Sequence, residues 1–401
     1  MLINESRAAA LMDAAGLDAL VGTRVENVFY LSGIYNISQM MFPYDQQCYA
    51  VVTRDQLTSP TVVISTGDWD QSTVAFPGLR ATVHYGTFIR ELPEAGEGAM
   101  DDLERKTKID TIDSKPRANA LEALIATLEE LGLTDKRIGI DEKAFNPSYW
   151  AELERRLPNL KAVPAADLFR SIRMVKTEEE IRRLRQAAIV TEGGIKAAVA
   201  VAREGVTERE MVRAFQHAVI DGGGSPTFTM IRFGRNAALG QIPAGDTKLR
   251  PGDMIWFDVG CLVEGYWADI ARIFTLGEPS KKLSTYYNAM LVGEQHAIDI
   301  TRAGMTSGEL FEATVKAVQE AGVPHYRRHH VGHGIGVEVY DSPLLAPGQT
   351  HVLENGMVIN IETPYYELAF GAVHVEDPFV IREGGNEVLT TLSRELGIIP
   401  L

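Results

Sequence analysis

The sequence is poor in cysteine and has no long apolar run. Only two cysteines, Cys48 and Cys261, occur among 401 residues, far apart and without CxxC spacing. This argues against a disulfide framework and favours a reducing compartment. No stretch approaches the roughly 18 apolar residues of a membrane-spanning helix. The N-terminal segment MLINESRAAALMDAAGLDAL also lacks the basic and apolar parts of a secretory signal. We therefore expect a cytoplasmic protein with no membrane partner.

Basic residues are also few relative to acidic ones. Lys and Arg number 39 against 54 Asp and Glu, which gives a formal net charge of −15. Such a surface repels phosphate backbones, so nucleic acid is not an expected partner. The apolar fraction of 45% and the charged fraction of 23% are those of an ordinary globular protein. The length is sufficient for two domains.

The first 160 or so residues alternate short apolar runs with helical stretches, which predicts an α/β domain. Strands are expected at residues 18–22, 27–31, 48–53, 61–65 and 137–141, and a helix at 118–131. The charged segment 91–108 predicts a surface helix or loop. We place a domain boundary near residue 170, because Thr177 and Glu180 form a capping-box pattern that begins a long helix. Further helices are expected at 208–220 and 283–303.

The run DMIWFDVGCLVEGYWADIARIFTLG contains two alternating segments around a turn signal, which predicts a β-hairpin. A register centred between Val263 and Glu264 places Asp258 opposite Asp269, roughly 5 Å apart at Cβ. Two carboxylates at that distance repel each other unless a proton or a cation lies between them.

Three later stretches also contain carboxylate or histidine side chains that are possible metal ligands. The alternation of MVINIETPYY puts Asn360 and Glu362 on one face, and AVHVEDPFVI puts His374 and Glu376 on one face. The glycines of HHVGHGIG around His333 favour a loop or strand, so this is not an HExxH helix. Each group alone is compatible with solvated surface or an ordinary loop. Burying all of the carboxylates without cations costs many kcal/mol, so the pattern indicates a metal site.

Five ligand-type residues occur in a characteristic order: Asp258, Asp269, His333, Glu362 and Glu376. This order, with GHGIG around the histidine, resembles the M24 superfamily of methionine aminopeptidases, prolidases and creatinases. The resemblance covers essentially the whole chain. It implies an α/β protein with a creatinase-type N-terminal domain at residues 1–165 and a pita-bread catalytic domain at residues 166–401.

The resemblance also implies two divalent transition-metal ions. Asp258 is expected to bind one ion, while Asp269 and Glu376 bridge both. His333 and Glu362 complete the other coordination sphere, and Glu362 also acts as the proton shuttle for the attacking water. A carboxylate-rich ligand set suits Mn, Co, Fe or Zn. The family further implies a homodimer and a small peptide or small-molecule substrate.

Three positions depart from the peptidase pattern of the family. Gln241 and Tyr340 stand where peptidases carry histidines, and His374 stands where prolidases usually carry arginine, whereas His329 is retained. We expect Gln241, Tyr340 and His329 to be catalytic and His374 to bind substrate. Gln241 and Tyr340 can donate hydrogen bonds to an oxyanion but do not change charge between pH 5 and 8. Alternatively, Gln241 is surface and Tyr340 is packing.

Residues 30–52 are similar to the creatinase and ectoine hydrolase branch, in which the N-terminal domain of one subunit closes over the active site of its dimer partner. Tyr44 and Gln47 are therefore expected to line a small-substrate pocket, the alternative being an ordinary crossover between strands.

The leading hypothesis for function is a metal-dependent hydrolase of C–N bonds, nearest to Xaa-Pro dipeptidases and aminopeptidases. The alternative is a small-molecule hydrolase or lyase on the same fold, acting on a creatine-like, ectoine-like or sulfonium substrate, since Gln241 and Tyr340 replace the peptidase histidines. Metal-free creatinase lacks several ligands, which disfavours that activity. A non-catalytic module, as among histone-chaperone relatives, is disfavoured by the complete ligand set.

Overall fold

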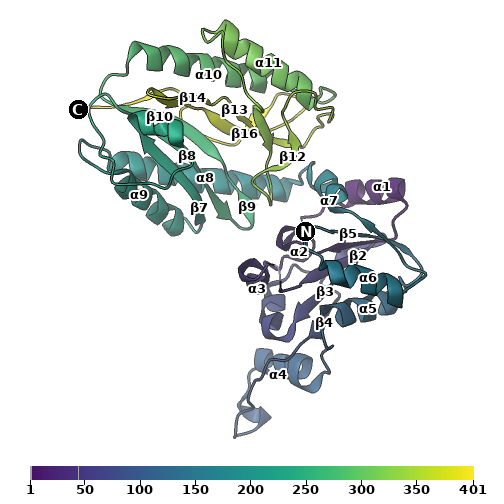
Figure 1. Cartoon of the computed structure of the whole chain (residues 1–401). Coiled ribbons are helices and arrows are strands. Elements are labelled where there is room, and N and C mark those ends of the chain that lie inside the picture. Colours follow the sequence, from purple (N-terminus) through teal and green to yellow (C-terminus); the bar gives the residue numbers. More distant parts are fainter. Residues whose placement is uncertain (1, 44) are drawn as a thin grey trace. The chain divides into compact units, whose positions relative to one another are not determined.

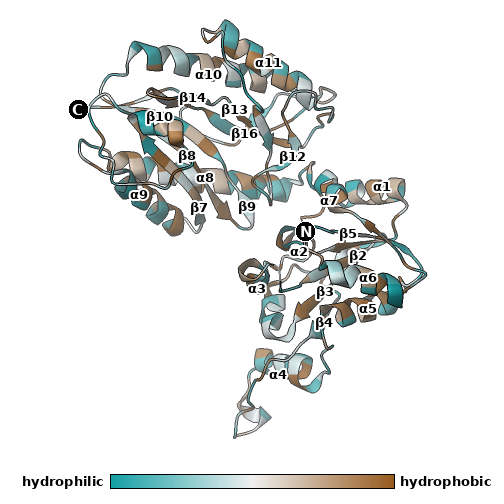
Figure 2. Cartoon of the chain, viewed as in Figure 1, coloured by the Kyte–Doolittle hydropathy of each residue, from teal (hydrophilic) through white to brown (hydrophobic). Residues whose placement is uncertain are grey.

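The computed structural model describes residues 2–43 and 45–401, which form two compact units, one ending at Arg173 and one spanning Met174–Leu401. Figure 1 shows that each unit has its own sheet flanked by helices. Figure 2 shows hydrophobic residues on the strands of both units. Within the described part of the chain, no helix has the length and apolar character needed to cross a bilayer.

The first unit is built on a six-stranded mixed sheet with the order β4-β3-β2-β1-β5-β6. Its strands are β1 (Ala19–Gly22), β2 (Tyr49–Thr53), β3 (Gln56–Ser65), β4 (Ala81–Tyr85), β5 (Arg137–Ile140) and β6 (Lys161–Pro164). Its α-helices are α1 (Glu5–Ala15), α2 (Val25–Ser32), α3 (Ile37–Met41), α4 (Asp102–Lys108), α5 (Ala120–Glu130), α6 (Pro147–Arg156) and α7 (Ala166–Arg173). Short non-α turns are η1 (Thr66–Val74), η2 (Glu97–Ala99) and η3 (Ile109–Asp113).

Most of the elements expected in this unit are confirmed, but one is wrong. The strands expected at 18–22, 48–53, 61–65 and 137–141 correspond to β1, β2, β3 and β5, and the helix expected at 118–131 is α5. The strand expected at 27–31 is instead part of α2, which ends at Gly33 in the left-handed conformation. Every residue from Asn27 to Ser32 is buried. A short apolar run that is buried on all sides has no periodicity to distinguish helix from strand.

The second unit has a largely antiparallel ten-stranded sheet whose main path is β12-β11-β13-β16-β10-β8-β7. Its longer strands are β7 (Ser225–Phe233), β8 (Met254–Val263), β10 (Ile270–Leu276), β12 (Asp341–Leu344), β13 (Val358–Glu362) and β16 (Glu376–Val380). Its short strands are β9 (Tyr266–Trp267), β11 (Gly332–Gly334), β14 (Tyr365–Glu367), β15 (Gly371–Val373), β17 (Glu387–Val388) and β18 (Gly397–Ile399). The strands β14 and β15 form a separate two-stranded sheet.

Four α-helices and one 3-10 turn accompany this sheet: α8 (Glu178–Ala200), α9 (Glu208–Asp221), η4 (Gly234–Leu239), α10 (Lys281–Ile300) and α11 (Ser307–Glu320). The helices α8 and α9 pack on β7 and β8, and α10 packs on β13 (Figure 1). The predicted helices are confirmed, as is the capping box of Thr177 and Glu180. Apolar residues such as Phe215 and Phe257 fill the space between helices and sheet and leave the other face of the strands free to carry polar groups.

The predicted hairpin is confirmed, but its predicted register is wrong by two residues. Both Glu264 (φ 48°) and Gly265 (φ 80°) adopt the left-handed conformation that a two-residue type I′ turn requires. The hairpin is therefore centred between these two residues, and Asp258 pairs with Ala271 instead of Asp269. Because the shift is even, Asp258 and Asp269 still lie on the same face.

The chain leaves the hairpin ladder at Ala268 and Asp269, directly against Gly260 of β8. A Cβ atom on Gly260 would lie 2.0 Å from the carbonyl oxygen of Ala268 and 2.5 Å from the ring of Phe228. Only glycine therefore permits the backbone that carries Asp269 to approach β8 this closely.

We predict that Gly260→Ala lowers the free energy of unfolding by about 1–3 kcal/mol, because the added methyl group must displace the Ala268 segment. Denaturant unfolding of the full chain measures this change. Gly193→Ala is the matched control, since Gly193 lies exposed in α8 with no heavy atom within 4 Å of the new Cβ. Equal stability of Gly260→Ala and the wild type would show that the close approach is not rigid.

Candidate metal centre

The structure brings all five predicted ligand residues together on one face of the second sheet. They are Asp258 on β8, Asp269 just before β10, His333 on β11, Glu362 at the end of β13 and Glu376 at the start of β16. The backbone register explains this, because Ala271 pairs with both Asp258 and Glu376, and Glu362 pairs with Glu376. The strands that carry these residues are neighbours in the sheet.

The ligand-type atoms form two overlapping groups. In one group, His333 Nε2 lies 3.8 Å from Asp269 Oδ2 and 4.0 Å from Glu376 Oε1. The other group contains Asp258, His374 and Glu376, and in each group the three candidate ligand atoms lie within 4.8 Å of one another. Glu376 belongs to both groups, as a bridging carboxylate does.

The proximity of the carboxylates strongly shifts their pKa values. Burial, together with the charge of Glu362, raises the pKa of Asp258 to about 6. Burial and neighbouring carboxylates raise the pKa of Asp269 and Glu376 well above the usual range. Although burial opposes its ionisation, the imidazoles of His330 and His374 lower the pKa of Glu362 well below its usual value. Negative charge is therefore concentrated in this group of four carboxylates. Among the described residues, no Lys or Arg side chain forms an ion pair with any of them.

The donor set fits divalent cations. His333 Nδ1 lies 2.9 Å from the carbonyl oxygen of Gly334, a contact that favours a proton on Nδ1 and leaves the lone pair of Nε2 for a metal. Asn360 Nδ2 donates to Glu376 Oε1 at 2.6 Å and orients that carboxylate. Within the described chain, His333 Nε2 and Asp269 Oδ1 are buried without a hydrogen-bond partner. Buried acceptors in this state are suited to a cation.

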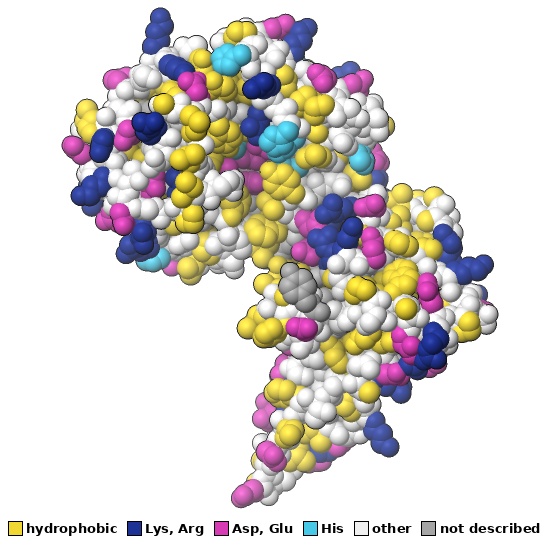
Figure 3. Space-filling view, viewed as in Figure 1, with side chains coloured by type: hydrophobic (Ala, Val, Ile, Leu, Met, Phe, Trp, Pro, Cys, Tyr) yellow, Lys and Arg dark blue, Asp and Glu magenta, His cyan; other side chains and the backbone are white. Residues whose placement is uncertain are grey.

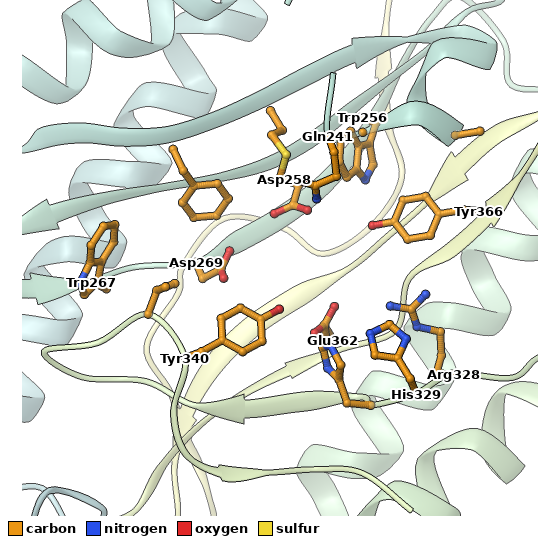
Figure 4. Close-up of a pocket in the computed structure, with 16 residues that line it drawn as sticks. Gln241, Trp256, Asp258, Trp267, Asp269, Arg328, His329, Tyr340, Glu362 and Tyr366 are labelled. Carbon is orange, nitrogen blue, oxygen red and sulfur yellow. Dashed lines mark ion pairs between the residues drawn. The ribbon is translucent and has the colours of Figure 1, made fainter. Parts of the chain in front are cut away.

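A cavity of about 580 Å³ opens beside the cluster. Figure 4 shows Asp258, Asp269 and Glu362 pointing their carboxylates toward a common space, which the hydroxyls of Tyr340 and Tyr366 also face. On the surface, acidic and histidine side chains meet in a hollow of the second unit (Figure 3). The space next to the carboxylates is therefore open to a small ligand.

The other predicted site residues differ in their placement. Gln241, His329 and Tyr340 line the cavity. The ring of Tyr340 stacks on that of His333 with 3.8 Å between centroids, so Tyr340 packs against the cluster as well as facing the cavity. His374 is buried among the carboxylates and is not one of the residues that line the cavity.

Of the two residues expected from the N-terminal segment, the structure describes only Gln47. Gln47 is buried in the first unit, where its side-chain oxygen accepts a hydrogen bond of 2.8 Å from Tyr49. Tyr44 lies outside the described residues. Their expected role across a dimer stays a prediction.

Sequence reasoning missed four residues of the site. His330 Nδ1 lies 3.0 Å from Glu362 Oε1, Trp256 stacks on His374, and Arg328 and Tyr366 line the cavity. Trp256 was detectable, because it lies two positions before Asp258 on the same strand face. The other three lie in irregular or short segments whose direction no periodicity reveals.

Comparison with known families agrees with this geometry. Residues 182–383 match metallopeptidase family M24, which is half of the chain. The chain is a member of metallopeptidase family M24. Residues 6–175 match the creatinase/prolidase N-terminal domain. Membership of M24 implies a metal-dependent hydrolase.

Several M24 relatives have names that describe peptidases. An Xaa-Pro dipeptidase of Lactobacillus delbrueckii subsp. lactis is 31% identical over 266 residues, which cover 65% of this chain and 72% of that protein. An Xaa-Pro dipeptidase of Pyrococcus furiosus is 33% identical over 232 residues, covering 57% of this chain and 67% of that protein. The crystal structure of an X-Pro aminopeptidase from Thermotoga maritima has a TM-score of 0.75 at 23% identity, with 99% of both chains covered, and shows the shared fold.

These matches confirm the predicted fold of this M24 protein, a creatinase-type N-terminal α/β domain followed by a pita-bread domain. The curled antiparallel sheet of the second unit is the pita-bread part, and its inner face carries the acidic cluster.

We predict that Asp258→Asn stabilises the metal-free protein near neutral pH by about 1–2 kcal/mol. The gain is modest because the side chain keeps some solvent exposure, which reduces the cost of its charge. The neutral amide removes the cost of burying a charge. The advantage shrinks as pH falls from about 6 toward 4, because Asp258 then takes up a proton in the folded chain while it stays ionised in the unfolded chain.

Denaturant unfolding in a chelator at pH 7.5 and pH 4.5 measures this difference. Asp221→Asn, at an exposed position of α9, is the control. An advantage of Asp258→Asn that is the same at both pH values would contradict the raised pKa of Asp258.

Proposed function

We propose that this protein hydrolyses a C–N bond of a small Xaa-Pro peptide with the help of two divalent transition-metal ions. The observation that carries the proposal is that two overlapping groups of possible metal ligands, with Glu362 beside them, lie next to a cavity large enough for a short peptide. The names of the relatives as Xaa-Pro dipeptidases support the substrate class. The second unit would carry the activity, in a cytoplasmic homodimer.

The ligand roles are those that the family resemblance implies, and the two overlapping groups support the sharing of Glu376. Asp258 would hold one ion, and Asp269 and Glu376 would be shared by both ions. His333 and Glu362 would complete the second ion's ligands. When bound, such ions polarise the scissile carbonyl and lower the pKa of a bound water. The residues that orient these ligands, Asn360 among them, prepare the site before substrate arrives.

Glu362 is the group in this site best placed to accept a proton. It faces the cavity, and the neighbouring imidazoles lower its pKa, which favours the ionised form that can accept a proton. His330 Nδ1 lies 3.0 Å from Glu362 Oε1, so an imidazole stands directly beside the carboxylate. We infer that Glu362 receives the proton of the attacking water and passes it to the leaving nitrogen.

Tyr340 and Gln241 supply neutral hydrogen-bond donors on the cavity wall. Burial and the surrounding carboxylates raise the pKa of Tyr340, so its hydroxyl keeps its proton and can donate to an oxyanion. The stacking of Tyr340 on His333 holds the ring in place. His329 lines the cavity beside them and would contact the substrate.

Arg328 is the only Lys or Arg among the described residues that line the cavity. Its guanidinium lies over the ring of Tyr366, 5.6 Å from the centroid, and its Nε is buried without a hydrogen-bond partner within the described chain. A guanidinium with free donors matches a carboxylate. Arg328 therefore favours a short peptide with a free C-terminus.

A second candidate function is a small-molecule amidase or lyase on the same site. The observation that favours it is that Gln241 and Tyr340, and no histidine, occupy the two cavity positions where family peptidases carry imidazoles. Such a substrate would need oxyanion stabilisation but no proton from either position.

We predict hydrolysis of Xaa-Pro dipeptides that is lost on chelation and restored by Mn or Co. A panel of Xaa-Pro dipeptides, their C-terminal amides, longer Xaa-Pro peptides and small cyclic or quaternary amides tests the substrate class. The free dipeptides should exceed their amides in kcat/KM because Arg328 binds the carboxylate. Cleavage of a small amide with no cleavage of any proline peptide would favour the second function instead.

Asp269→Asn should reduce dipeptide hydrolysis to background, because the shared ligand of both ions is lost. Asp299→Asn, at an exposed position of α10, is the matched control and should keep wild-type turnover. Circular dichroism verifies that both variants fold. Full turnover by folded Asp269→Asn would rule out the ligand assignment.

Tyr340→Phe should lower kcat by roughly a hundredfold or more with little change in KM, as when one oxyanion donor is removed. The control is Tyr286→Phe, which makes the same change away from the cavity. If kcat falls less than threefold, Tyr340 serves packing against His333 only.

A further inference from the structure

His374 occupies a position in the acidic cluster that the five-ligand scheme does not explain. It lies between β15 and β16, two residues before Glu376, so that both side chains project from the same face. Its ring is 1% exposed and stacks on Trp256 with centroids 6.3 Å apart and 20° between the planes. The indole and the imidazole are therefore nearly parallel.

Both ring nitrogens of His374 face carboxylates. Nε2 lies 3.3 Å from Glu376 Oε2 and 3.5 Å from Glu362 Oε2, and Nδ1 lies 3.9 Å from Asp258 Oδ2. Neither nitrogen makes a hydrogen bond of acceptable geometry to any described residue. A buried imidazole in this state is unusual unless it has another partner.

The surroundings of His374 mirror those of His333. Each imidazole shares Glu376 with one aspartate: Asp269 for His333 and Asp258 for His374. In each group the three ligand atoms are close enough to contact one ion. The two groups therefore form a pair of similar sites, each with one nitrogen donor, joined by Glu376.

We propose that His374 is a sixth protein ligand, which binds the ion on the Asp258 side. This inference rests on the proposed function, because it presupposes that the cluster holds two ions. A neutral imidazole offers the lone pair of one ring nitrogen to a metal.

The charge balance is in keeping with this role. Asp258, Asp269, Glu362 and Glu376 supply four negative charges, which two divalent ions neutralise. A neutral imidazole adds a donor without disturbing this balance. A second nitrogen donor also shifts the metal preference toward ions that favour imidazole, such as Zn and Co, over Mn.

The experiment uses the full-length, metal-stripped protein and Co(II) as the probe. Calorimetric titration counts the ions and gives their Kd values, while visible absorption reports the ligand field. The wild type should bind two Co(II) ions per chain. His374→Ala should weaken one of the two sites tenfold or more and alter the absorption of that ion, leaving the other site unchanged.

Three further variants make the result specific. His374→Arg should show the same selective loss, because it restores bulk but no lone pair. In His374→Gly, added free imidazole should restore the wild-type absorption. His325→Ala, a change at an exposed histidine that contacts Tyr365, controls for nonspecific binding by imidazoles and should behave as the wild type. Thermal unfolding of the metal-free variants verifies that each is folded.

The outcomes separate this inference from the proposed function. If folded His374→Ala binds two Co(II) ions with the Kd values and absorption of the wild type, the proposed role of His374 is overturned. This result would not overturn the proposed hydrolase function. If the wild type binds two Co(II) ions and His374→Ala selectively loses one, His374 is supported as the sixth ligand. This holds even where no proline peptide is cleaved. A wild type that binds no Co(II) would overturn both.

Discussion

Repulsion among buried carboxylates is the constraint on which the second unit depends. Asp269 and Glu376 sit on an apolar sheet where their charged forms are strongly disfavoured, and cations are the natural way to relieve that cost. On the opposite face of the sheet, Asp377 of β16 forms a buried ion pair with Arg272 of β10. Arg272, 1% exposed, donates to Asp377 Oδ1 at 2.6 Å and to the carbonyl oxygen of Glu376 at 3.1 Å. These contacts connect the backbone that presents the Glu376 carboxylate to β10.

The antiparallel sheet explains why the site was largely visible in the sequence. Alternation alone put Asp258 and Asp269 on one face, and an error of two residues in the hairpin register did not matter because the side-chain period of a strand is two. The same rule correctly paired His374 with Glu376. The face of the sheet on which a residue lies can thus be predicted more reliably than its exact cross-strand partner. A site that depends only on the face is still predicted correctly when the turn is misplaced by an even number of residues. The family resemblance then supplied the roles that alternation cannot assign.

Other features were beyond sequence reasoning for identifiable reasons. The segment 27–31 was expected to be a strand, but burial on all sides of α2 removes the pattern that marks a helix. His330 reaches Glu362 from an irregular segment, where no period fixes the side-chain direction. Arg328 meets Tyr366 across a long separation in sequence, and such contacts follow from tertiary packing alone. The cytoplasmic location, the dimer and the role of Gln47 stay predictions, because none of them depends on the fold of a single chain.

The charge of the cavity distinguishes the candidate substrates. Two divalent ions, bound as proposed, would balance the four carboxylates and form a neutral centre, to which the donors Gln241 and Tyr340 add no charge. The guanidinium of Arg328 then gives the cavity wall a positive charge. It also lies over the ring of Tyr366, an aromatic face that would otherwise attract a cation. A sulfonium or other cationic substrate would meet like charge at Arg328, whereas the free carboxylate of a dipeptide would meet an unpaired donor. The residues that replace the family histidines therefore do not by themselves argue for a cationic small molecule, and the charge on the cavity wall favours the peptide.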